Sequence, residues 1–491
     1  MTDQTTQIDE GSSPFTSAAA PGAMPRRDVM IIAVLLVSTF VVILNETIMS
    51  IALPVLAEDL RVDYSQGQWL TSGFLLTMAV VIPVTGFLIR RIRTRVLFML
   101  AMTLFSAGTL LAALAPSFEV LLAARVVQAS GTAIMMPLLM TTVMKLVPGE
   151  RRGAVMGNIG TVIAVAPAIG PTISGFVLHS LGWRALYWLV LPIALAALAF
   201  GIRSMIDVGE PERVRVDVVS VLLSGIGFGA LVYGLSAFGH EGGGAGGVPA
   251  WVPIVGGAAV LTVFVVRQLQ LQRTDDALLD LRTFTSGGFT IAAVLMVLMM
   301  TVLFGAIILL PIYMQEIMGL DVQTSGLVLL PGGLVMGLLG PVVGRLYDRV
   351  GARRLLVPGV VVTSLALWST TLFTAQTGIA LLLAFHITLS VGLAFVFTPL
   401  FTSGLGAVQP RFYSYGSAIF GTTQQLAGAA GVALLVSVMS ARAGSLAAAG
   451  AAPVEATVGG IHTAFLVAAV LSLVAIVGAF FVRTPQGAPA H

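Results

Sequence analysis

Long runs of apolar residues, bounded by charged or polar positions, dominate the pattern of the chain. Between Arg354 and Arg411 lie 56 residues without Asp, Glu, Lys or Arg, and between Arg282 and Glu316 lie 33 more. A helix needs about 20 apolar residues to cross a bilayer, so each run is long enough for at least one membrane span. Runs bounded in this way predict fourteen spans, at residues 29–56, 68–89, 96–115, 119–144, 153–178, 184–206, 217–238, 251–268, 288–315, 322–346, 355–373, 378–404, 415–440 and 460–482.

Composition supports a membrane protein. Of the 491 residues, 57% are hydrophobic and only 10% are charged, whereas a soluble domain carries about 25% charged residues. This balance excludes a soluble enzyme of several domains. The chain has no cysteine, which excludes disulfides, thiolate metal sites, cysteine nucleophiles and iron–sulfur clusters.

The basic residues fix the expected orientation of the spans. With a cytoplasmic N-terminus, 21 of the 25 Lys and Arg residues fall in inner loops, and only Arg61, Arg184 and Arg442 fall in outer loops. Arg125 lies within a span. Cytoplasmic loops of membrane proteins carry an excess of Lys and Arg, so we expect a multi-pass protein of the cytoplasmic (inner) membrane with both termini inside. The net charge of +3 therefore marks a membrane face and does not predict nucleic-acid binding.

An internal repeat divides the chain. Residues 83–97 and 341–355 are identical at 7 of 15 positions, and each segment follows the second span of a six-span unit. Repeated halves around a central cleft are typical of secondary transporters. The predicted organisation is a disordered tail 1–27, an N-terminal six-helix half 28–206, two inserted helices 217–268, a C-terminal six-helix half 288–483 and a tail 484–491. A flexible segment, Gly242–Gly247, is expected between the two inserted helices.

Ionisable residues inside spans are few, and such residues are usually functional. Glu46 lies in the first span, about 15 Å below its outer end, and Arg125 lies in the fourth span, about 9 Å below. Burial favours the protonated carboxyl and a nearby guanidinium favours the ionised one, so Glu46 can alternate between a proton and a cation. A fixed ion pair that only joins two helices is the alternative.

Other polar residues at depth are candidates for a substrate cleft. His386 titrates near neutral pH in water, but a neutral histidine bonded to another helix is the favoured interpretation. The amide side chains either contact substrate or bridge helices, as polar side chains do in membranes. These amides are Asn45, Gln128, Asn158, Gln424 and Gln425.

The fifth span is rich in glycine and proline. Its segment 166–175 carries Pro167, Gly170 and Pro171. Small residues let helices approach closely, and proline removes a backbone donor and bends a helix. This composition favours a pivot at a gate.

Taken together, these residues resemble the major facilitator superfamily over residues 28–483. The segment from Gly344 to Arg354 resembles the cytoplasmic loop motif of that superfamily, the pair Arg125 and Gln128 resembles its fourth-helix motif, and residues 166–175 resemble its fifth-helix antiporter motif. Fourteen spans resemble its drug:proton antiporter family. Within that family, residues 44–54, the segment from Gln68 to Thr71 and the segment from Tyr413 to Gln425 resemble the lincomycin-resistance type of multidrug exporter.

The resemblance implies an all-α major facilitator fold of two six-helix halves and two inserted helices, working as a self-sufficient monomer. It implies a proton-coupled antiporter that exports drugs or lipophilic cations by alternating access, driven by the proton gradient without a cofactor, metal or catalytic residue. The loop motif's acid pairs with basic loop residues and a neighbouring helix end to hold the closed state. The gating residues that the resemblance implies are Gly86, Arg91, Pro167, Gly170, Pro171, Gly344, Asp348, Arg349, Gly351 and Arg353.

Two positions depart from the family pattern. Arg90 stands where the family has an acid, at the counterpart of Asp348, so the lock is expected in the C-terminal half rather than the N-terminal one. Many relatives carry Asp where Asn45 stands, and here the acid is Glu46, one position and about 100° further around the helix.

Other functions of a multi-pass chain leave different marks on a sequence. One keeps the fold but exports a single metabolite, lipid or cell-envelope precursor. A membrane-embedded enzyme is disfavoured because the five histidines form no HExxH pair. An ATP-driven pump is excluded within this chain because Lys145, its one lysine, is not in a Walker sequence. A channel's ring of repeated charges is not visible.

The 25 Phe and 20 Met residues suit loose selectivity, but they are also ordinary lipid-facing residues.

Overall fold

The computed structural model describes residues 24–212, 217–238, 249–374 and 376–482, and these residues form helices and connections without a strand. Fourteen of the helices are long and apolar enough to cross a membrane, which confirms the predicted all-α class. The helices are α1 (Arg26–Asp59), α2 (Tyr64–Gly67), α3 (Trp69–Arg91), α4 (Thr94–Ala113), α5 (Phe118–Leu146), α6 (Arg152–Leu181), α7 (Arg184–Ser204), α8 (Val218–Phe238), α9 (Trp251–Leu271), α10 (Gly287–Ile312), α11 (Val322–Val350), α12 (Arg353–Ser369), α13 (Ile379–Gly406), α14 (Tyr413–Ala448) and α15 (Pro453–Ala479).

The helix ends follow local chemistry. The Asp321 side chain accepts a hydrogen bond from the backbone N–H of Thr324 at 3.3 Å and caps α11. The same helix ends at Gly351, which has φ +81°, a left-handed conformation that glycine adopts without a Cβ clash. A proline at the first helical position, Pro453, opens α15.

The largest boundary difference lies between the last two spans. Helix α14 continues to Ala448, eight residues beyond the predicted span, and α15 begins at Pro453, seven residues before it. Residues 441–459 are rich in alanine, which has the highest helix propensity, so both helices extend beyond their apolar runs. The predicted glycine-rich segment 242–247, the tail 484–491 and residues 1–23 of the N-terminal tail lie outside the described residues.

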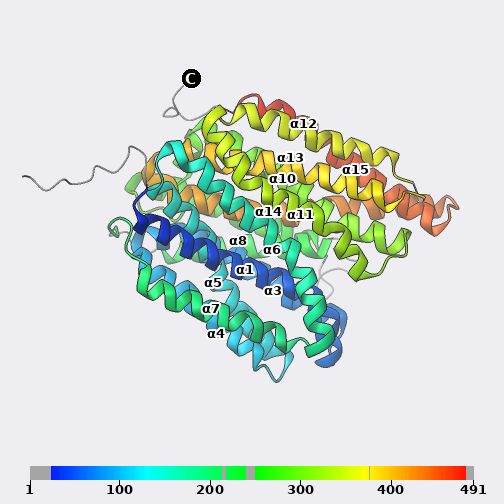
Figure 1. Ribbon diagram of the computed structural model, residues 1–491, viewed down its shortest axis with the longest axis horizontal. Helices are drawn as coiled ribbons and strands as arrows, with labels where there is room; N and C mark the ends of the chain where they lie inside the picture. Colours follow the sequence, from blue (N-terminus) through cyan, green and yellow to red (C-terminus); the bar gives the residue numbers. More distant parts are fainter. Residues whose placement is uncertain (1–23, 213–216, 239–248, 375, 483–491) are drawn as a thin grey trace, which may run out of the picture.

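The helices form two groups with two seams between them. In Figure 1, α4 and α7 of the N-terminal group lie along one edge, and α12 and α15 of the C-terminal group lie along the other. Helix α6 packs along α11 in the first seam, and α3 packs against α14 in the second. The inserted helix α8 packs on both α3 and α14, and α9 packs on α8. The inserted pair therefore covers the second seam.

One end of the bundle, called the arginine-rich end here, is where α3, α5, α11 and α13 finish and α4, α6, α12 and α14 begin. It carries Lys145 and most of the described arginines. The opposite end carries Arg61, Arg184 and Arg442. The predicted distribution of basic residues between two faces is thus present in the fold.

Candidate functional site

Glu46 lies on α1 where this helix packs against the proline- and glycine-rich part of α6. The Thr47 hydroxyl reaches the Ala166 carbonyl at 3.4 Å, and the Ser174 hydroxyl donates to the Ile48 carbonyl at 2.9 Å. Glu46 itself is half-buried. The structure thus brings the candidate carboxylate next to the antiporter-like segment of α6.

Arg125 on α5 is 2% exposed and is held by partners other than Glu46. Its Nη1 donates to Gln128 Oε1 at 2.7 Å, and its Nε lies 3.4 Å from the Leu70 carbonyl. Its guanidinium carbon stands 4.1 Å from the centre of the Phe74 ring. A guanidinium fixed in this way keeps its position when its acidic neighbour changes charge.

Glu46 and Arg125 interact electrostatically inside the protein. Within the described part of the chain, however, no ion pair of 4 Å or less joins them. The arrangement differs from a fixed ion pair and leaves the Glu46 carboxylate without a bound guanidinium.

Tyr187 on α7 is a member of this cluster that sequence reasoning missed. It is fully buried, interacts electrostatically with Arg125, and its hydroxyl has no hydrogen-bond partner among the described residues. Its place three residues after Arg184, at the outer end of a predicted span, gave no motif or repeat that would have identified it.

The two asparagines and Gln128 occupy different surroundings. Gln128 is fully buried, and its Nε2 donates to the Thr109 hydroxyl at 2.8 Å while its oxygen binds Arg125. Its polar atoms are therefore used within the N-terminal group, where they orient Arg125. Asn45 is 1% exposed, with an Nδ2 that has no partner among the described residues. Asn158 is exposed on α6.

The remaining polar candidates lie in the C-terminal group. His386 Nε2 is 3.0 Å from the Leu329 carbonyl of α11, so this histidine bonds to another helix. Gln425 Nε2 lies 3.8 Å from Met78 Sδ and crosses the seam between α14 and α3. Gln424 is half-buried on the same helix.

Helix α6 packs closely on two sides, against α1 and against α11. Gly170 meets Thr47 of α1, and a Cβ at Gly170 would overlap that side chain. Pro167 and Pro171 lie half-buried on either side of this contact. On the face toward α11, Gly157 and Gly340 approach so closely that a Cβ on either one would overlap the carbonyl of the other. The packing of α6 on α1 and its packing on α11 therefore both depend on small residues.

The C-terminal copy of the loop motif joins the two groups at the arginine-rich end. The two carboxylate oxygens of Asp348 accept hydrogen bonds from the backbone N–H groups of Gly153 at 2.7 Å and Ala154 at 2.8 Å. These groups belong to the first turn of α6, where unpaired N–H groups attract anions. Arg349 is exposed, and Arg353 lies 5.5 Å from the ring of Phe480.

The N-terminal copy makes a different contact at the same end. Arg90 donates to the Tyr415 hydroxyl and to the Glu212 carboxylate, with an Nε–Oε2 distance of 2.7 Å. The Glu212 backbone N–H also donates to the Arg90 carbonyl at 2.8 Å. Gly86 packs against the first turns of α14, and Arg91 lies 5.9 Å from the Phe87 ring.

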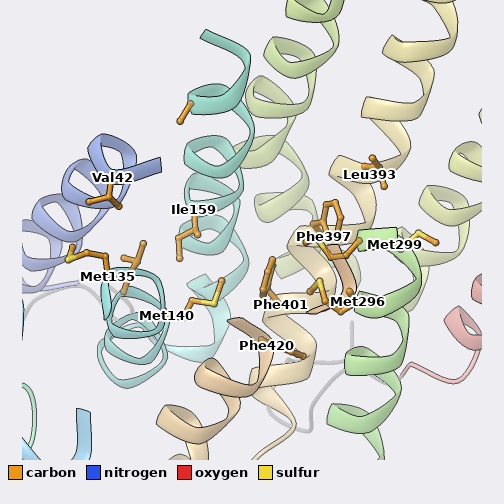
Figure 2. Close-up of a cluster of buried hydrophobic side chains, with 14 of the residues drawn as sticks. Val42, Met135, Met140, Ile159, Met296, Met299, Leu393, Phe397, Phe401 and Phe420 are labelled. Atoms are coloured by element: carbon orange, nitrogen blue, oxygen red, sulfur yellow. The ribbon is translucent and has the colours of Figure 1, made fainter. Parts of the chain in front are cut away.

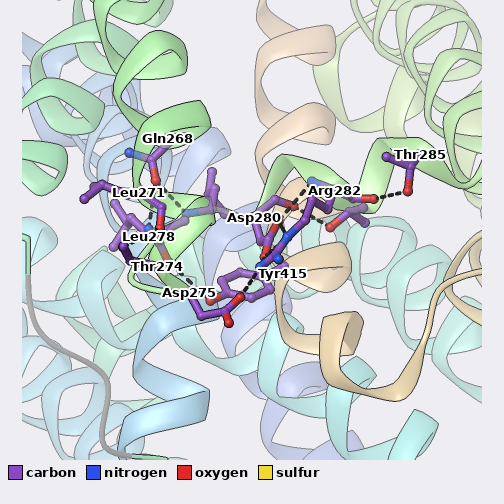
Figure 3. A network of polar contacts seen from close by, with 12 residues as sticks. Gln268, Leu271, Thr274, Asp275, Leu278, Asp280, Arg282, Thr285 and Tyr415 are labelled. Atoms are coloured by element: carbon purple, nitrogen blue, oxygen red, sulfur yellow. Dashed lines mark hydrogen bonds and ion pairs between the residues drawn. The ribbon is translucent and has the colours of Figure 1, made fainter.

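Both connections of the inserted helices reach this contact. Glu212 precedes α8, and the Ala277 carbonyl after α9 accepts from the Tyr415 hydroxyl at 3.2 Å. Figure 3 shows the second connection, in which the Arg282 guanidinium binds Asp275 and Asp280. Hydrogen bonds from Arg282 lower the pKa of Asp275.

The base of the inserted pair is fixed by a second ion pair. Arg267 donates to the two Asp217 oxygens at 2.6 and 2.8 Å. These bonds lower the pKa of Asp217 to about 2.

Methionine and phenylalanine fill the space between the two groups. Figure 2 shows Met135 and Met140 of α5 on one side and Phe397 and Phe401 of α13 on the other. All four side chains are 5% exposed or less. Their flexible or flat surfaces can repack around ligands of different shapes.

The sequence matches the Major Facilitator Superfamily over residues 35–432, and the chain belongs to this family of membrane transporters. It is 39% identical over 458 residues to the uncharacterized MFS-type transporter YcnB of Bacillus subtilis, covering 93% of this chain and 95% of the relative. It is 38% identical over 455 residues to the lincomycin resistance protein LmrB of the same organism, covering 91% and 94%.

A solved structure with a similar fold is the human organic anion transporter MFSD10. It superposes with a TM-score of 0.68 at 15% identity, and the alignment covers 93% of this chain and all of that one. At this identity the likeness supports the fold alone. The expected family and the fourteen-helix fold are thereby confirmed.

Proposed function

We propose that this protein is a proton-coupled multidrug efflux antiporter of the cytoplasmic membrane that exports lipophilic or cationic small molecules by alternating access. Family membership and similarity to a lincomycin resistance protein support drug export. The single observation that carries the coupling is Glu46, a half-buried acid beside a fixed Arg125 and against the pivot-like segment of α6.

The proposed exchange takes place at the Glu46 carboxylate. Its partial exposure lets a proton or a cationic group reach it, and burial favours the protonated form when no cation is near. Arg125 is bound by Gln128 and the Leu70 carbonyl, so it does not follow Glu46 when the carboxylate changes partner. One carboxylate in this position supports exchange of one proton for one monovalent cation.

The gates of the cycle follow from the contacts between the two groups. The excess of basic residues assigns the arginine-rich end to the cytoplasm. In this arrangement Asp348 and Arg90 close the cytoplasmic end, and the Thr141 hydroxyl donates to Ser417 across the same closure at 3.1 Å. Near the opposite end of α3, Trp69 stacks on Tyr233 of the inserted helix α8, with 5.7 Å between the ring centres. In the proposed cycle this end is the one that opens to the outside.

The proposed opening to the cytoplasm breaks the Asp348 and Arg90 contacts. Substrate then enters between the groups, and the Met and Phe side chains of Figure 2 supply an adaptable apolar wall. Return to the outward-facing arrangement re-forms the two contacts and releases substrate outside.

Reconstitution tests this function. Purified protein in liposomes with an imposed pH gradient is expected to move a lipophilic cationic dye or lincomycin against its own gradient. Glu46→Gln is expected to abolish gradient-driven movement while the protein still inserts. Glu119→Gln, the same change at an exposed acid, serves as the control and is expected to transport normally. Full gradient-dependent transport by Glu46→Gln would overturn the role of Glu46, and one narrow substrate in a resistance panel would favour a dedicated exporter.

A further inference from the structure

A cavity of about 170 Å³ opens at the arginine-rich end between the two groups of helices. Its walls come from the end of α3, the end of α5, the segment between α7 and α8, and the turn that leads into α14. Its lining includes Arg90 and Glu212 of the N-terminal contact but not Glu46, so the proposed exchange of proton and cargo takes place elsewhere. A cavity of this size has room for several waters or for one small polyatomic anion.

The charges around the cavity are unequal. Four cationic side chains line it, from Arg90, Arg93, Lys145 and Arg411, against two carboxylates, from Glu210 and Glu212. One of these carboxylates is already bound by Arg90, and Arg93 lies 3.9 Å from Asp207 outside the cavity. The remaining two cations, Lys145 and Arg411, are the ones free of an ion pair among the described residues.

Lys145 and Arg411 have no acidic partner within 4 Å in the part of the chain that the structure describes. Lys145 lines the cavity together with Arg90 and Glu212 and interacts electrostatically with both. The Arg411 guanidinium carbon lies 4.6 Å from the centre of the Phe412 ring. Arg411 also lines the cavity, and the acid that it interacts with electrostatically, Asp275, is already bound by Arg282. Such a pair is suited to an anion that is not part of this chain.

We propose that this cavity is a binding site for a phosphate-bearing anion. Arginine offers a planar fork of donors and lysine a compact charge, and the two together are a frequent combination for phosphate oxygens. The Ser414 side chain also lines the cavity and adds a hydroxyl. The shared chemistry fits a phospholipid headgroup at the membrane surface and a soluble phosphate in the cytoplasm alike.

The site spans the two groups of helices. Lys145 and Arg90 belong to the N-terminal group, whereas Arg411 and Ser414 belong to the C-terminal group. An anion bound to both groups interacts better with the closed arrangement than with one in which they separate, so it shifts the population toward closure. The ligand therefore acts as a regulator of the gate and is distinct from the exported cargo.

Binding can be measured without a gradient or a drug. In one arm, purified protein in neutral detergent is titrated with inorganic pyrophosphate. In the other arm, micelles doped with phosphatidylglycerol or with phosphatidylcholine are examined by native mass spectrometry. Retention of phosphatidylglycerol alone identifies a lipid headgroup as the source, and saturable pyrophosphate binding identifies a soluble one.

The test variant is Lys145→Ala with Arg411→Ala, and the control is Arg151→Ala with Arg203→Ala, which removes two exposed arginines of the same end that do not line the cavity. We expect about a tenfold loss of affinity in the test variant and none in the control. Glu210→Gln is expected to tighten binding by about threefold, because it removes a lining carboxylate and leaves the Arg90–Glu212 contact intact. This gain keeps the proposal testable should the double variant fold poorly.

Equal affinity of the wild type, test and control variants, or no binding in either arm, would overturn the proposal. Glu46→Gln is expected to bind the anion as the wild type does. A failure of the anion site is therefore distinguishable from a failure of the transport function, because each is read from a different variant and a different measurement.

Discussion

The two copies of the repeated loop motif occupy matching places in the fold but join the helix groups by different chemistry. In the C-terminal copy, the Asp348 carboxylate binds two backbone N–H groups at the start of α6. In the N-terminal copy, Arg90 stands at the matching position and binds a tyrosine hydroxyl and a glutamate from elsewhere in the chain. The duplication has therefore preserved the place of the contact and not its partners.

The difference assigns a place to the inserted helices. A carboxylate bound to backbone N–H groups needs no further side chain, whereas the Arg90 contact uses Glu212 from the connection before α8 and Tyr415, which is bound in turn by the connection after α9. The second seam is thus closed with help from the insertion that covers it. The first seam is closed mainly by direct packing of α6 on α11.

The largest effect is expected from Asp348→Asn. The substitution replaces one of two acceptor oxygens with an amide that cannot accept, and it removes the charge that interacts with the α6 terminus. We expect the closed arrangement to lose about 3–5 kcal/mol. The chain has no cysteine, so Ser417→Cys, buried between the groups, reports opening by maleimide labelling.

The expected result is fast labelling of Ser417→Cys in the Asp348→Asn background and slow labelling in an Asp276→Asn background. Asp276 lies at the same end and has no ion pair of 4 Å or less among the described residues. Equal labelling in both backgrounds would contradict a lock at Asp348.

Alanine at the matching glycines of the repeat tests which of the two seams is packed more tightly. A Cβ at Gly344 would overlap the Gly153 carbonyl, whereas a Cβ at Gly86 would lie 3.1 Å from Ala418 Cβ and 3.2 Å from the Ser414 carbonyl. We expect Gly344→Ala to destabilise the closed arrangement by about 2–3 kcal/mol and Gly86→Ala by about 1 kcal/mol or less. Thermal unfolding and Ser417→Cys labelling measure both, and a larger effect at Gly86 would reverse the assignment of the tighter seam.

Tyr415→Phe isolates the hydroxyl at the centre of the N-terminal contact. The ring remains available to Arg90, whose guanidinium carbon lies 5.0 Å from its centre, but the bonds to Arg90 and to the Ala277 carbonyl are lost. We expect the closed arrangement to be destabilised by about 1–2 kcal/mol. The part of the effect that comes from the Arg90 bond should disappear in an Arg90→Ala background, whereas the part from the Ala277 bond should remain. A double-mutant cycle separates the two parts; full additivity would show that Tyr415 and Arg90 act separately.

The smallest expected effect concerns the base of the inserted pair. The folded-state pKa of Asp217, about 2, lies below its ordinary value of 3.8, so the ion pair with Arg267 stabilises the fold fully above pH 4 and progressively less as the pH falls toward 2. Asp217→Asn is expected to lower the free energy of unfolding by about 1 kcal/mol at pH 7 and by less at pH 3. Thermal unfolding in detergent checks this, and a difference that grows on acidification would contradict it.

The sequence allowed the fourteen spans to be predicted because apolar length and bounding charges determine which segments can cross a bilayer. The resemblance to the family also predicted that Asp348 would join the two groups and that Arg90, at the matching position, would not do so in the same way. The partners of Arg90 were beyond its reach, because Tyr415 and Glu212 lie 325 and 122 residues away and no pattern links them. The sequence left open whether Gln128 contacts substrate or bridges helices, since only the folded structure shows that its amide is bound to Arg125 and Thr109.

Exchange of a proton for cargo at Glu46 can be followed as proton release on binding. Purified protein in lightly buffered detergent is mixed with a lipophilic cationic dye at a pH where the empty carboxyl is largely protonated, and a pH indicator follows the solution. We expect the wild type and Glu119→Gln to release about one proton per dye bound, and Glu46→Gln to release none. Release of the same amount from Glu46→Gln at equal dye binding would contradict exchange at Glu46.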